Sequence, residues 1–497
     1  MQHKLQKMDH NNVNQIMLQS KIAFDQYKKT KPSARASFLK TIAECIEKKR
    51  EALVQVANEE TNLPAARLNG EISRTTGQLN MFAVLLEDGS WVEAVIDTAD
   101  NNKTPPKPDT RKMLLPTGPV IVFGASNFPF AFSTAGGDTA SALAAGCTVV
   151  VKGHPAHPKT SLMVYEAIAE AIRLCNMPQH TIQHAAGESN DLGRDLVIHP
   201  NTAGVGFTGS YRGGKALVEY ARQREIPVPV FAEMSSINPV VFLPETITRN
   251  SVTLAQQFVA SLNLGAGQFC TNPGLMLVMK CDGLNGFLSK IARAIDAVVP
   301  QKMLHKDIHQ SYYNGVNNML KQDGIELLAQ SAQLPDEMEA RSSVARVMAS
   351  TFLENPSLHK EVFGPYSLAV VCNDKEEMIA VLSSLKGQLT GTIMGTPGDF
   401  ENHQDIIEIQ TALAGRIILN GAPTGVEVCA SMVHGGPYPA TTDGRFTSVG
   451  TAAIKRWVRP VCFQNFLDNL LPAALQNNNP LHIWRLVNNQ FSKDAVL

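Results

Sequence analysis

The sequence predicts an α/β protein built from two parallel-sheet units. From residue 113 onward, short apolar runs alternate with helical stretches, the pattern of buried parallel strands joined by crossover helices. The alternation resumes after Val252, which indicates a second unit of the same kind. A chain of 497 residues with 44% hydrophobic residues has enough apolar surface for two large domains, and chains of this length rarely fold around one core.

The first part of the chain, residues 10–100, is predicted to be mainly helical. Apolar side chains recur there every three or four positions, as in Phe38, Ile42 and Ile46. The polar, proline-rich segment 101–112 that follows predicts a linker or an exposed crossing.

The expected elements of the two sheets follow in order. The first group of strands is predicted at 120–123, 148–151, 228–231 and 240–243, with a helix over 160–174. The second unit is predicted to contain a helix ending at 262, a strand at 275–279, a helix near 287–298 and strands at 368–371 and 416–419. After Arg459 the pattern is less regular, and we expect the apolar residues of this tail to pack against another surface, such as a second subunit.

Composition excludes several classes of protein. The 44 Lys and Arg residues balance 45 Asp and Glu, for a net charge of −1, whereas nucleic-acid binders and polybasic membrane-surface proteins depend on clustered positive charge. The eight cysteines contain no CxxC pair and have irregular spacing, which is typical of free thiols in a reducing compartment. The polar start and the lack of an apolar run of about 20 residues predict no signal peptide, no membrane span and a cytoplasmic location.

A glycine pattern suggests a nucleotide site. Gly204, Gly206 and Gly209 form GxGxxG between an expected strand and an expected helix over 216–222. In an ordinary dinucleotide-binding domain such glycines let backbone N–H groups approach a pyrophosphate, and an acid about 20 residues on, here Glu233, binds a ribose. The overlapping GSYRGGK has the P-loop spacing, but Ala216 stands where a magnesium-binding Ser or Thr is needed.

The histidines give no metal motif. His154 and His157 are three residues apart, but the prolines beside them forbid a regular helix. The sequence contains neither HExxH nor a Cys/His cluster, so it predicts no zinc site.

Cys270 is the strongest catalytic candidate. It stands in GAGQFCTNPG, where glycines give the backbone the freedom that a nucleophile needs if neighbouring N–H groups are to face an oxyanion. A cysteine chosen at random is more often a small core residue. Three companions favour the nucleophile: Glu233 ends an expected strand, Asn127 follows another in GASNFP, and Glu361 lies in EVFGP.

These segments resemble the aldehyde dehydrogenase superfamily from roughly residue 15 to residue 460. The matching motifs are ASNFP, VVVKGHP, GFTGS, FAEMS, GQFC and EVFGP. The segments NGAPTGVEVC and MVHGGPYPATTD, with the long tail, resemble the branch of NADP-dependent fatty aldehyde and α-ketoglutaric semialdehyde (2,5-dioxovalerate) dehydrogenases. The resemblance implies two Rossmann-like domains and a small oligomerisation element. Their expected ranges are 1–99, 119–234 and 435–456 for the cofactor domain, 235–434 for the catalytic domain, and 100–118 with the tail 457–497 for the oligomerisation element.

The resemblance also implies a mechanism and replaces the ribose interpretation of Glu233. The Cys270 thiolate attacks the aldehyde, while the Asn127 amide and the Cys270 N–H hold the oxyanion. Hydride transfer leaves a thioester, which Glu233 hydrolyses by activating water. Because no Lys or His neighbours Cys270 in the sequence, we expect Glu233 or the positive nicotinamide ring to activate the thiol.

Cofactor residues follow from the same resemblance. It implies Lys152 at the adenosine ribose, Gly209 and Ser210 at the pyrophosphate, and Glu361 at the nicotinamide ribose with Phe363 beside it. NAD-preferring members often have a glutamate where this chain has Pro155, so NADP is expected to be preferred and NAD accepted, without a metal.

The expected substrate is an aldehyde, either 2-oxoglutarate semialdehyde or a fatty aldehyde. The residues expected beside it are Phe128, Phe269 and Val426. The family's usual Gly-Gly pair is replaced by Ser235-Ser236, for which the sequence offers no functional account.

Two alternatives remain open, and the expected assembly is a homodimer or homotetramer. A coenzyme-A-acylating relative is disfavoured by the retained Glu233. A non-catalytic protein that reuses the fold is disfavoured because four residues are intact: Cys270, Glu233, Asn127 and Lys152.

Overall fold

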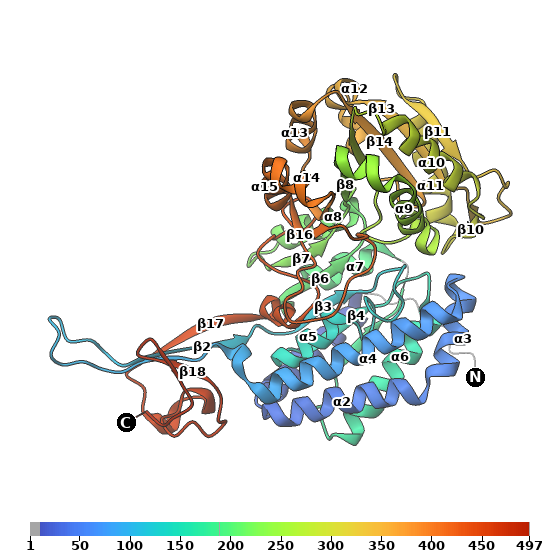
Figure 1. Cartoon of the computed structure of the whole chain (residues 1–497). Helices are drawn as coiled ribbons and strands as arrows, with labels where there is room; N and C mark the ends of the chain where they lie inside the picture. Colours follow the sequence, from blue (N-terminus) through green and yellow to red (C-terminus); the bar gives the residue numbers. More distant parts are fainter. Residues whose placement is uncertain (1–9, 188, 497) are drawn as a thin grey trace.

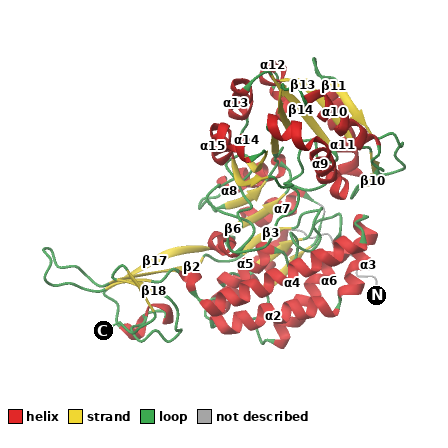
Figure 2. Cartoon of the chain, viewed as in Figure 1, coloured by secondary structure: helices red, strands yellow, loops and turns green. Residues whose placement is uncertain are grey.

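The computed structural model describes residues 10–187 and 189–496, arranged as two lobes and a projecting arm (Figure 1). The polar N-terminal stretch, from which we predicted no signal peptide, lies largely outside the described residues, as do the first nine residues of the expected cofactor domain. Both lobes are α/β with parallel sheets, so the predicted fold class is confirmed. Figure 2 shows the helices packed around the strands of each lobe, while the arm is built mainly of strands and loops.

The lower lobe in Figure 1 contains a five-stranded parallel sheet in the order β5-β4-β3-β6-β7. Its strands are β3 (Val120–Phe123), β4 (Val149–Lys152), β5 (Ile182–Ala185), β6 (Gly204–Thr208) and β7 (Val230–Glu233). Its helices are α1 (His10–Tyr27), α2 (Pro32–Lys48), α3 (Arg50–Thr61), α4 (Ala65–Asp88), α5 (Gly137–Ala145), α6 (Pro158–Leu174), α7 (Asn190–Ile198) and α8 (Tyr211–Arg222).

Alternating side chains of these strands build two separate cores. Val120 and Val122 of β3 join the core made with α2–α6, whereas Ile121 between them joins the core made with α1, α7 and α8. This is the period of two expected for a strand buried on both faces.

The upper lobe contains a seven-stranded sheet in the order β11-β13-β14-β9-β8-β15-β16, parallel except for the pairing of β11 with β13. Its strands are β8 (Pro239–Phe242), β9 (Leu275–Met279), β11 (Glu326–Gln330), β13 (Ser343–Met348), β14 (Tyr366–Cys372), β15 (Gln388–Met394) and β16 (Ala414–Leu419). A separate antiparallel pair joins β10 (Gln301–Lys302) to β12 (Glu339–Ala340).

The helices of the upper lobe cover both faces of its sheet. They are α9 (Pro244–Asn263), α10 (Leu284–Asp296), α11 (Lys306–Leu320), α12 (Ala349–Glu354), α13 (Lys375–Ser384), α14 (Pro397–Asn402) and α15 (Gln404–Leu413), with short 3-10 helices η2 (Leu264–Gly267) and η3 (Pro356–His359). Side chains of α9 and α10 form the core of one face, and those of α11, α12, α13 and α15 form the core of the other. Among the described residues, no helix combines the length and apolar character needed to cross a lipid bilayer.

The arm corrects two predictions. Its sheet has the order β17-β2-β1-β18-β19, from β1 (Val95–Asp97), β2 (Thr110–Pro116), β17 (Val458–Gln464), β18 (Arg485–Val487) and β19 (Gln490–Ser492). The end of the expected linker is therefore a strand, and the tail that was predicted to be less regular supplies three more. Four short 3-10 helices precede or separate these strands in the chain: η1 (Ser90–Val92), η4 (Thr451–Trp457), η5 (Asp468–Leu470) and η6 (Ala473–Leu475). Local sequence missed this because β2 and β17 pair across more than 300 residues.

The GxGxxG pattern is also corrected. Gly204 and Gly206 lie inside β6, and only Gly209 lies in the turn before α8, which begins at Tyr211. A Cβ at Gly206 would come within 2.8 Å of Asp138 Oδ2 and 3.1 Å of the Trp457 ring. Close packing of the strand, rather than a phosphate turn, therefore accounts for this glycine.

Candidate active site

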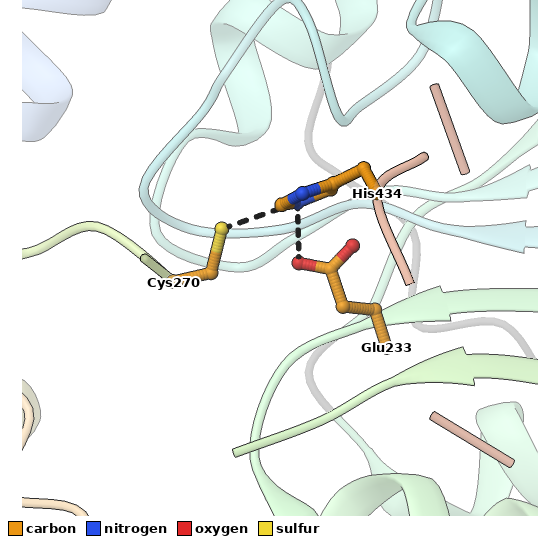
Figure 3. A group of neighbouring side chains, drawn as sticks. All are labelled: Glu233, Cys270 and His434. Atoms are coloured by element: carbon orange, nitrogen blue, oxygen red, sulfur yellow. Dashed lines mark hydrogen bonds and ion pairs between the residues drawn. The ribbon is translucent and has the colours of Figure 1, made fainter. Parts of the chain in front are cut away.

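Three reactive side chains from distant parts of the chain meet in one buried cluster. Glu233 ends β7, Cys270 follows η2, and His434 lies in the segment after β16 (Figure 3). The Cys270 Sγ is 3.4 Å from His434 Nε2, and the same nitrogen is 3.0 Å from Glu233 Oε1. Glu233 and His434 are 4% and 2% exposed, so water does not screen their interaction.

The backbone around Cys270 explains the glycines of its segment. Gly265, Ala266 and Gly267 all have left-handed φ values, of 57°, 55° and 64°, which glycine adopts without the penalty paid by other residues. A Cβ at Gly267 would lie 2.3 Å from the carbonyl carbon of Gly364. Only glycine at position 267 therefore lets the segment before Cys270 pack directly on the segment that carries Glu361.

Burial keeps Cys270 protonated at rest. It raises the pKa of the thiol well above its usual value, and the neighbouring Glu233 carboxylate raises it further. Burial also raises the pKa of Glu233, but the attraction of His434 and hydrogen bonds to that carboxyl outweigh it, so the net shift is downward. Ser448 contributes one of these bonds, since its Oγ donates to Glu233 Oε2 over 3.0 Å.

The cluster can transfer a proton as well as hold one. Sγ and Oε1 both approach His434 Nε2, which carries at most one hydrogen. When Nε2 takes the proton of the thiol, the imidazolium lies between the new thiolate and the carboxylate, and both anions stabilise it. This exchange avoids leaving two unscreened negative charges side by side.

Sequence reasoning missed His434. From the sequence we expected Glu233 or the nicotinamide ring to activate the thiol, and the structure adds a third group, His434, 3.4 Å from Sγ. His434 is 164 positions away from Cys270 in the chain. Its segment MVHGGPYPATTD stood out as a branch marker, and the lone histidine in that marker was the available signal.

Asn127 lies against the segment that carries Cys270. Its Nδ2 donates to the carbonyl oxygen of Gln268 over 3.1 Å, and the side chain is 8% exposed. The backbone carbonyl oxygen of Asn127 accepts a 2.7 Å hydrogen bond from Arg67 Nη2. The amide has two N–H groups, so one remains for a second acceptor near Cys270.

The expected cofactor residues lie at the carboxyl edge of the five-stranded sheet. Lys152 ends β4, and Gly209 and Ser210 follow β6. Ser210 caps α8, because its Oγ accepts from Gly213 N over 3.2 Å, and both Gly209 and Ser210 are exposed. A cation, a hydroxyl and an open helix N-terminus suit the phosphates and ribose hydroxyls of a dinucleotide. Pro155 is exposed in the loop between β4 and α6.

Glu361 and Phe363 lie between η3 and β14, and the Glu361 carboxyl is close enough to Cys270 to affect its thiol electrostatically. Burial raises the pKa of Glu361 to about 8, and a hydrogen bond with Ser235 partly opposes the rise. At neutral pH this carboxyl is therefore mostly protonated, able to donate as well as accept.

Ser235 and Ser236 now have a structural account. Ser235 contacts Glu361. The Ser236 Oγ lies 2.8 Å from Asn238 Oδ1 and 2.9 Å from Gln388 Oε1, and it accepts from Leu389 N over 3.0 Å. The pair thus joins the segment after β7 to β15 of the other lobe.

An apolar cluster adjoins the thiol and contains the three expected substrate residues. Phe128 and Phe269 pack edge to face with ring centroids 5.5 Å apart, and Val426 packs against the same cluster. Phe132 joins it and lies 6.1 Å from the His434 ring. An aldehyde bound to Cys270 beside these apolar side chains would be shielded from water.

The group of three reactive side chains described first has the composition of a possible metal site. The ligand atoms of Glu233, Cys270 and His434 lie within 4.8 Å of one another, and a thiolate, an imidazole and a carboxylate are ligands that zinc accepts. Such an ion would occupy the thiolate needed for covalent chemistry. The metal-free reaction expected from the sequence stays a prediction.

Two lobes with parallel sheets and a thiol beside an imidazole and a carboxylate fit the class that the family comparison shows, an oxidoreductase that acts on aldehydes with NAD(P). The chain belongs to the aldehyde dehydrogenase family, whose sequence model matches residues 2–446. This confirms the resemblance stated from the motifs.

Curated relatives and a solved structure agree with the family. The chain is 46% identical over 465 residues to alpha-ketoglutaric semialdehyde dehydrogenase 2 of Azospirillum brasilense, covering 93% of this chain and 89% of that one. It is also 46% identical over 469 residues to the alpha-ketoglutaric semialdehyde dehydrogenase of Acinetobacter baylyi, with 94% and 89% covered. An aldehyde dehydrogenase of Pseudomonas syringae, solved as a mutant with NAD⁺ and octanal, superposes with a TM-score of 0.78 at 18% identity, covering 93% and 90% of the two chains.

Proposed function

We propose that this dehydrogenase oxidises 2-oxoglutarate semialdehyde to 2-oxoglutarate, with Cys270 as the nucleophile. The observation that carries the mechanism is the joining of Cys270, His434 and Glu233 within hydrogen-bonding range. The substrate assignment draws on the two relatives of that name, each 46% identical to this chain over most of both lengths.

The first half of the reaction forms the covalent adduct. His434 Nε2 takes the proton of Cys270 as Sγ attacks the aldehyde carbon, and Glu233 stabilises the imidazolium. The Asn127 amide, which lies beside Gln268 of the same segment, donates to the developing oxyanion together with the Cys270 N–H. Bound NAD(P)⁺ supplies the hydride acceptor, and Cys270 is left as a thioester.

The second half needs water and a base. Glu233 is ionised at neutral pH, because its pKa is lowered by His434 and by hydrogen bonds that outweigh burial. It takes a proton from the attacking water, and the Cys270 thiolate leaves and recovers its proton. A base beside the thioester favours hydrolysis over transfer to coenzyme A.

A fatty aldehyde is the second candidate substrate. The cluster of Phe128, Phe132 and Phe269 would suit an alkyl chain. To decide between them, kcat/KM is measured for 2-oxoglutarate semialdehyde and for long-chain aldehydes, each with NAD and NADP. We expect the semialdehyde to be favoured by about tenfold or more, and a reversed order would contradict the proposal.

We further propose that NADP is preferred over NAD. Pro155 places no carboxylate where one would repel a 2′-phosphate, and Lys152 ends the strand beside it. Burial, followed by the charges of His157 and Lys152, lowers the pKa of His154 to about 3, so His154 is neutral there. Arg194, in α7, is paired with Asp191 over 3.1 Å and with Asp195 over 3.2 Å, so this proposal does not depend on it.

Pro155→Glu tests the cofactor preference. The wild type is expected to favour NADP by about tenfold, and the substitution should move the ratio of kcat/KM toward NAD by about the same factor. Pro155→Gln is the matched control, because it removes the proline without adding charge. An NAD preference in the wild type, or an equal effect of both substitutions, would contradict this prediction.

We also propose that the chain forms two domains and that the arm joins it to other subunits. The cofactor domain would comprise 1–99, 119–234 and 435–456, and the catalytic domain 235–434. The arm would join subunits in a homodimer or homotetramer, because it exposes large apolar side chains within one chain: Phe466 at 48%, Leu467 at 68%, Leu470 at 64%, Trp484 at 49% and Phe491 at 76%.

A further inference from the structure

Two arginines of α4 reach into the apolar cluster beside Cys270. Arg67 and Arg74 are seven residues, or two helical turns, apart, so they project from the same face of α4. The Arg67 guanidinium lies 5.1 Å from the Phe128 ring and 4.7 Å from the Phe269 ring. The Arg74 guanidinium lies 5.9 Å from Phe128 and 5.3 Å from Phe132.

In the part of the chain that the structure describes, neither guanidinium group forms a salt bridge, although the charges of Glu71, Glu233 and Glu427 act on Arg74 from further away. Among the described residues, Nε and Nη2 of Arg74 are buried without a hydrogen-bond partner. Nη1 of Arg67 is also buried and unpartnered, while its Nη2 holds Asn127. Both arginines are half-buried, but these nitrogen atoms are buried. Buried polar atoms of charged side chains are almost always paired, and contacts with aromatic faces replace only part of the lost hydration.

The nearby Glu71 does not fill this role. Its Oε1 accepts from Phe130 N over 2.8 Å and from Ala131 N over 2.9 Å, so it holds the segment after Asn127. Burial raises the pKa of Glu71 in spite of the attraction of Arg67 and Arg74. The higher pKa disfavours the charged form of Glu71, so this carboxyl is a weaker counter-charge for the two arginines.

The unpartnered atoms of Arg74 have the geometry of a carboxylate site. The Nε–H and Nη2–H bonds of a guanidinium run parallel and form the fork that binds a carboxylate through both oxygens. Arg74 is also close enough to Cys270 and Glu233 to interact with them electrostatically. A short aldehyde bound to Cys270 would therefore direct its other end toward Arg74.

We propose that Arg74, assisted by Nη1 of Arg67, binds a carboxylate at the end of the substrate remote from the aldehyde. This inference rests on the proposed function and deepens it: the enzyme selects short aldehydes that bear a distal carboxylate over uncharged aldehydes of equal length. Arg67 has a second task, because it also holds the carbonyl of Asn127, so Arg74 is the residue on which the test is made.

The test compares two aldehydes of five carbons, 5-oxopentanoate and pentanal, in the wild type and in Arg74→Leu and Arg74→Lys. We expect the ratio of their kcat/KM values to favour 5-oxopentanoate in the wild type and to fall by about 30-fold or more in Arg74→Leu, with a smaller fall in Arg74→Lys. Arg173→Leu, which removes an exposed arginine of α6, should leave the ratio unchanged.

The ratio separates binding of a carboxylate from an indirect effect on the thiol. An equal loss for both aldehydes would mean that Arg74 acts through Cys270 or the fold, and would overturn the inference. Inhibition by glutarate against pentanal gives a second measurement, and we expect the inhibition constant to rise by about 30-fold or more in Arg74→Leu. If the wild type favours pentanal, the proposed function fails, and the glutarate measurement alone then decides the inference, which falls if the two inhibition constants agree.

Discussion

Replacing Cys270 with alanine is expected to lower aldehyde oxidation to less than about a hundredth of the wild-type rate. The proposed reaction passes through a thioester on this sulfur, and loss of a nucleophile costs far more than about 3 kcal/mol of the activation barrier. Cofactor affinity should stay close to that of the wild type, because the expected cofactor residues lie at the end of β4, in the turn after β6 and in the segment before β14. Steady-state formation of NAD(P)H and direct titration of the cofactor measure the two quantities.

Cys429→Ala is the matched control for this experiment. Cys429 is another free, half-buried thiol, and it lies in the segment between β16 and His434. Its loss should leave turnover within about threefold of the wild type, because substitutions of partly exposed residues outside a reacting group usually have small effects. Turnover of Cys270→Ala above a hundredth of the wild-type rate would contradict covalent catalysis.

Replacing Glu233 with glutamine is expected to lower the steady-state rate by about 10²–10⁴-fold while cofactor affinity stays nearly unchanged. Glutamine keeps the size of the side chain but cannot accept the proton of the attacking water. The substitution also removes the charge that stabilises the His434 imidazolium, so formation of the thioester should slow as well, but less than its hydrolysis, and the thioester should accumulate. Rapid mixing of enzyme, cofactor and aldehyde measures the first turnover and the slow hydrolysis separately.

Ser448→Ala provides the control for Glu233. It removes the 3.0 Å hydrogen bond to Oε2 but keeps the carboxylate, so its rate should fall by about tenfold or less. A large loss of cofactor affinity in Glu233→Gln, with normal hydrolysis, would instead restore the ribose interpretation of this acid.

Much of the fold followed from local sequence. The predicted strand at 275–279 is confirmed as β9, and the helix over 160–174 lies within α6. Buried strands and amphipathic helices have periods of two and 3.6 residues, which can be read from a short window. The pairing of β2 with β17 has no such local signature, since the hydrogen bonds between them join segments more than 300 residues apart in the chain.

The candidate site divides in the same way. By itself the sequence determined the chemistry-bearing turns, because a cysteine among glycines, an acid ending a strand and an asparagine after one are local patterns, and it placed Cys270, Glu233 and Asn127 together as candidates. Only the tertiary structure brought in His434, 201 positions from Glu233, and the unpaired guanidinium of Arg74, which in the sequence is one arginine of an amphipathic helix. It also moved Gly204 and Gly206 from an expected phosphate turn into β6. The physical reason is that turn chemistry and periodicity act between neighbours in the chain, whereas the pKa of a thiol and the partners of a buried charge depend on which distant segments the packing of two lobes brings into contact.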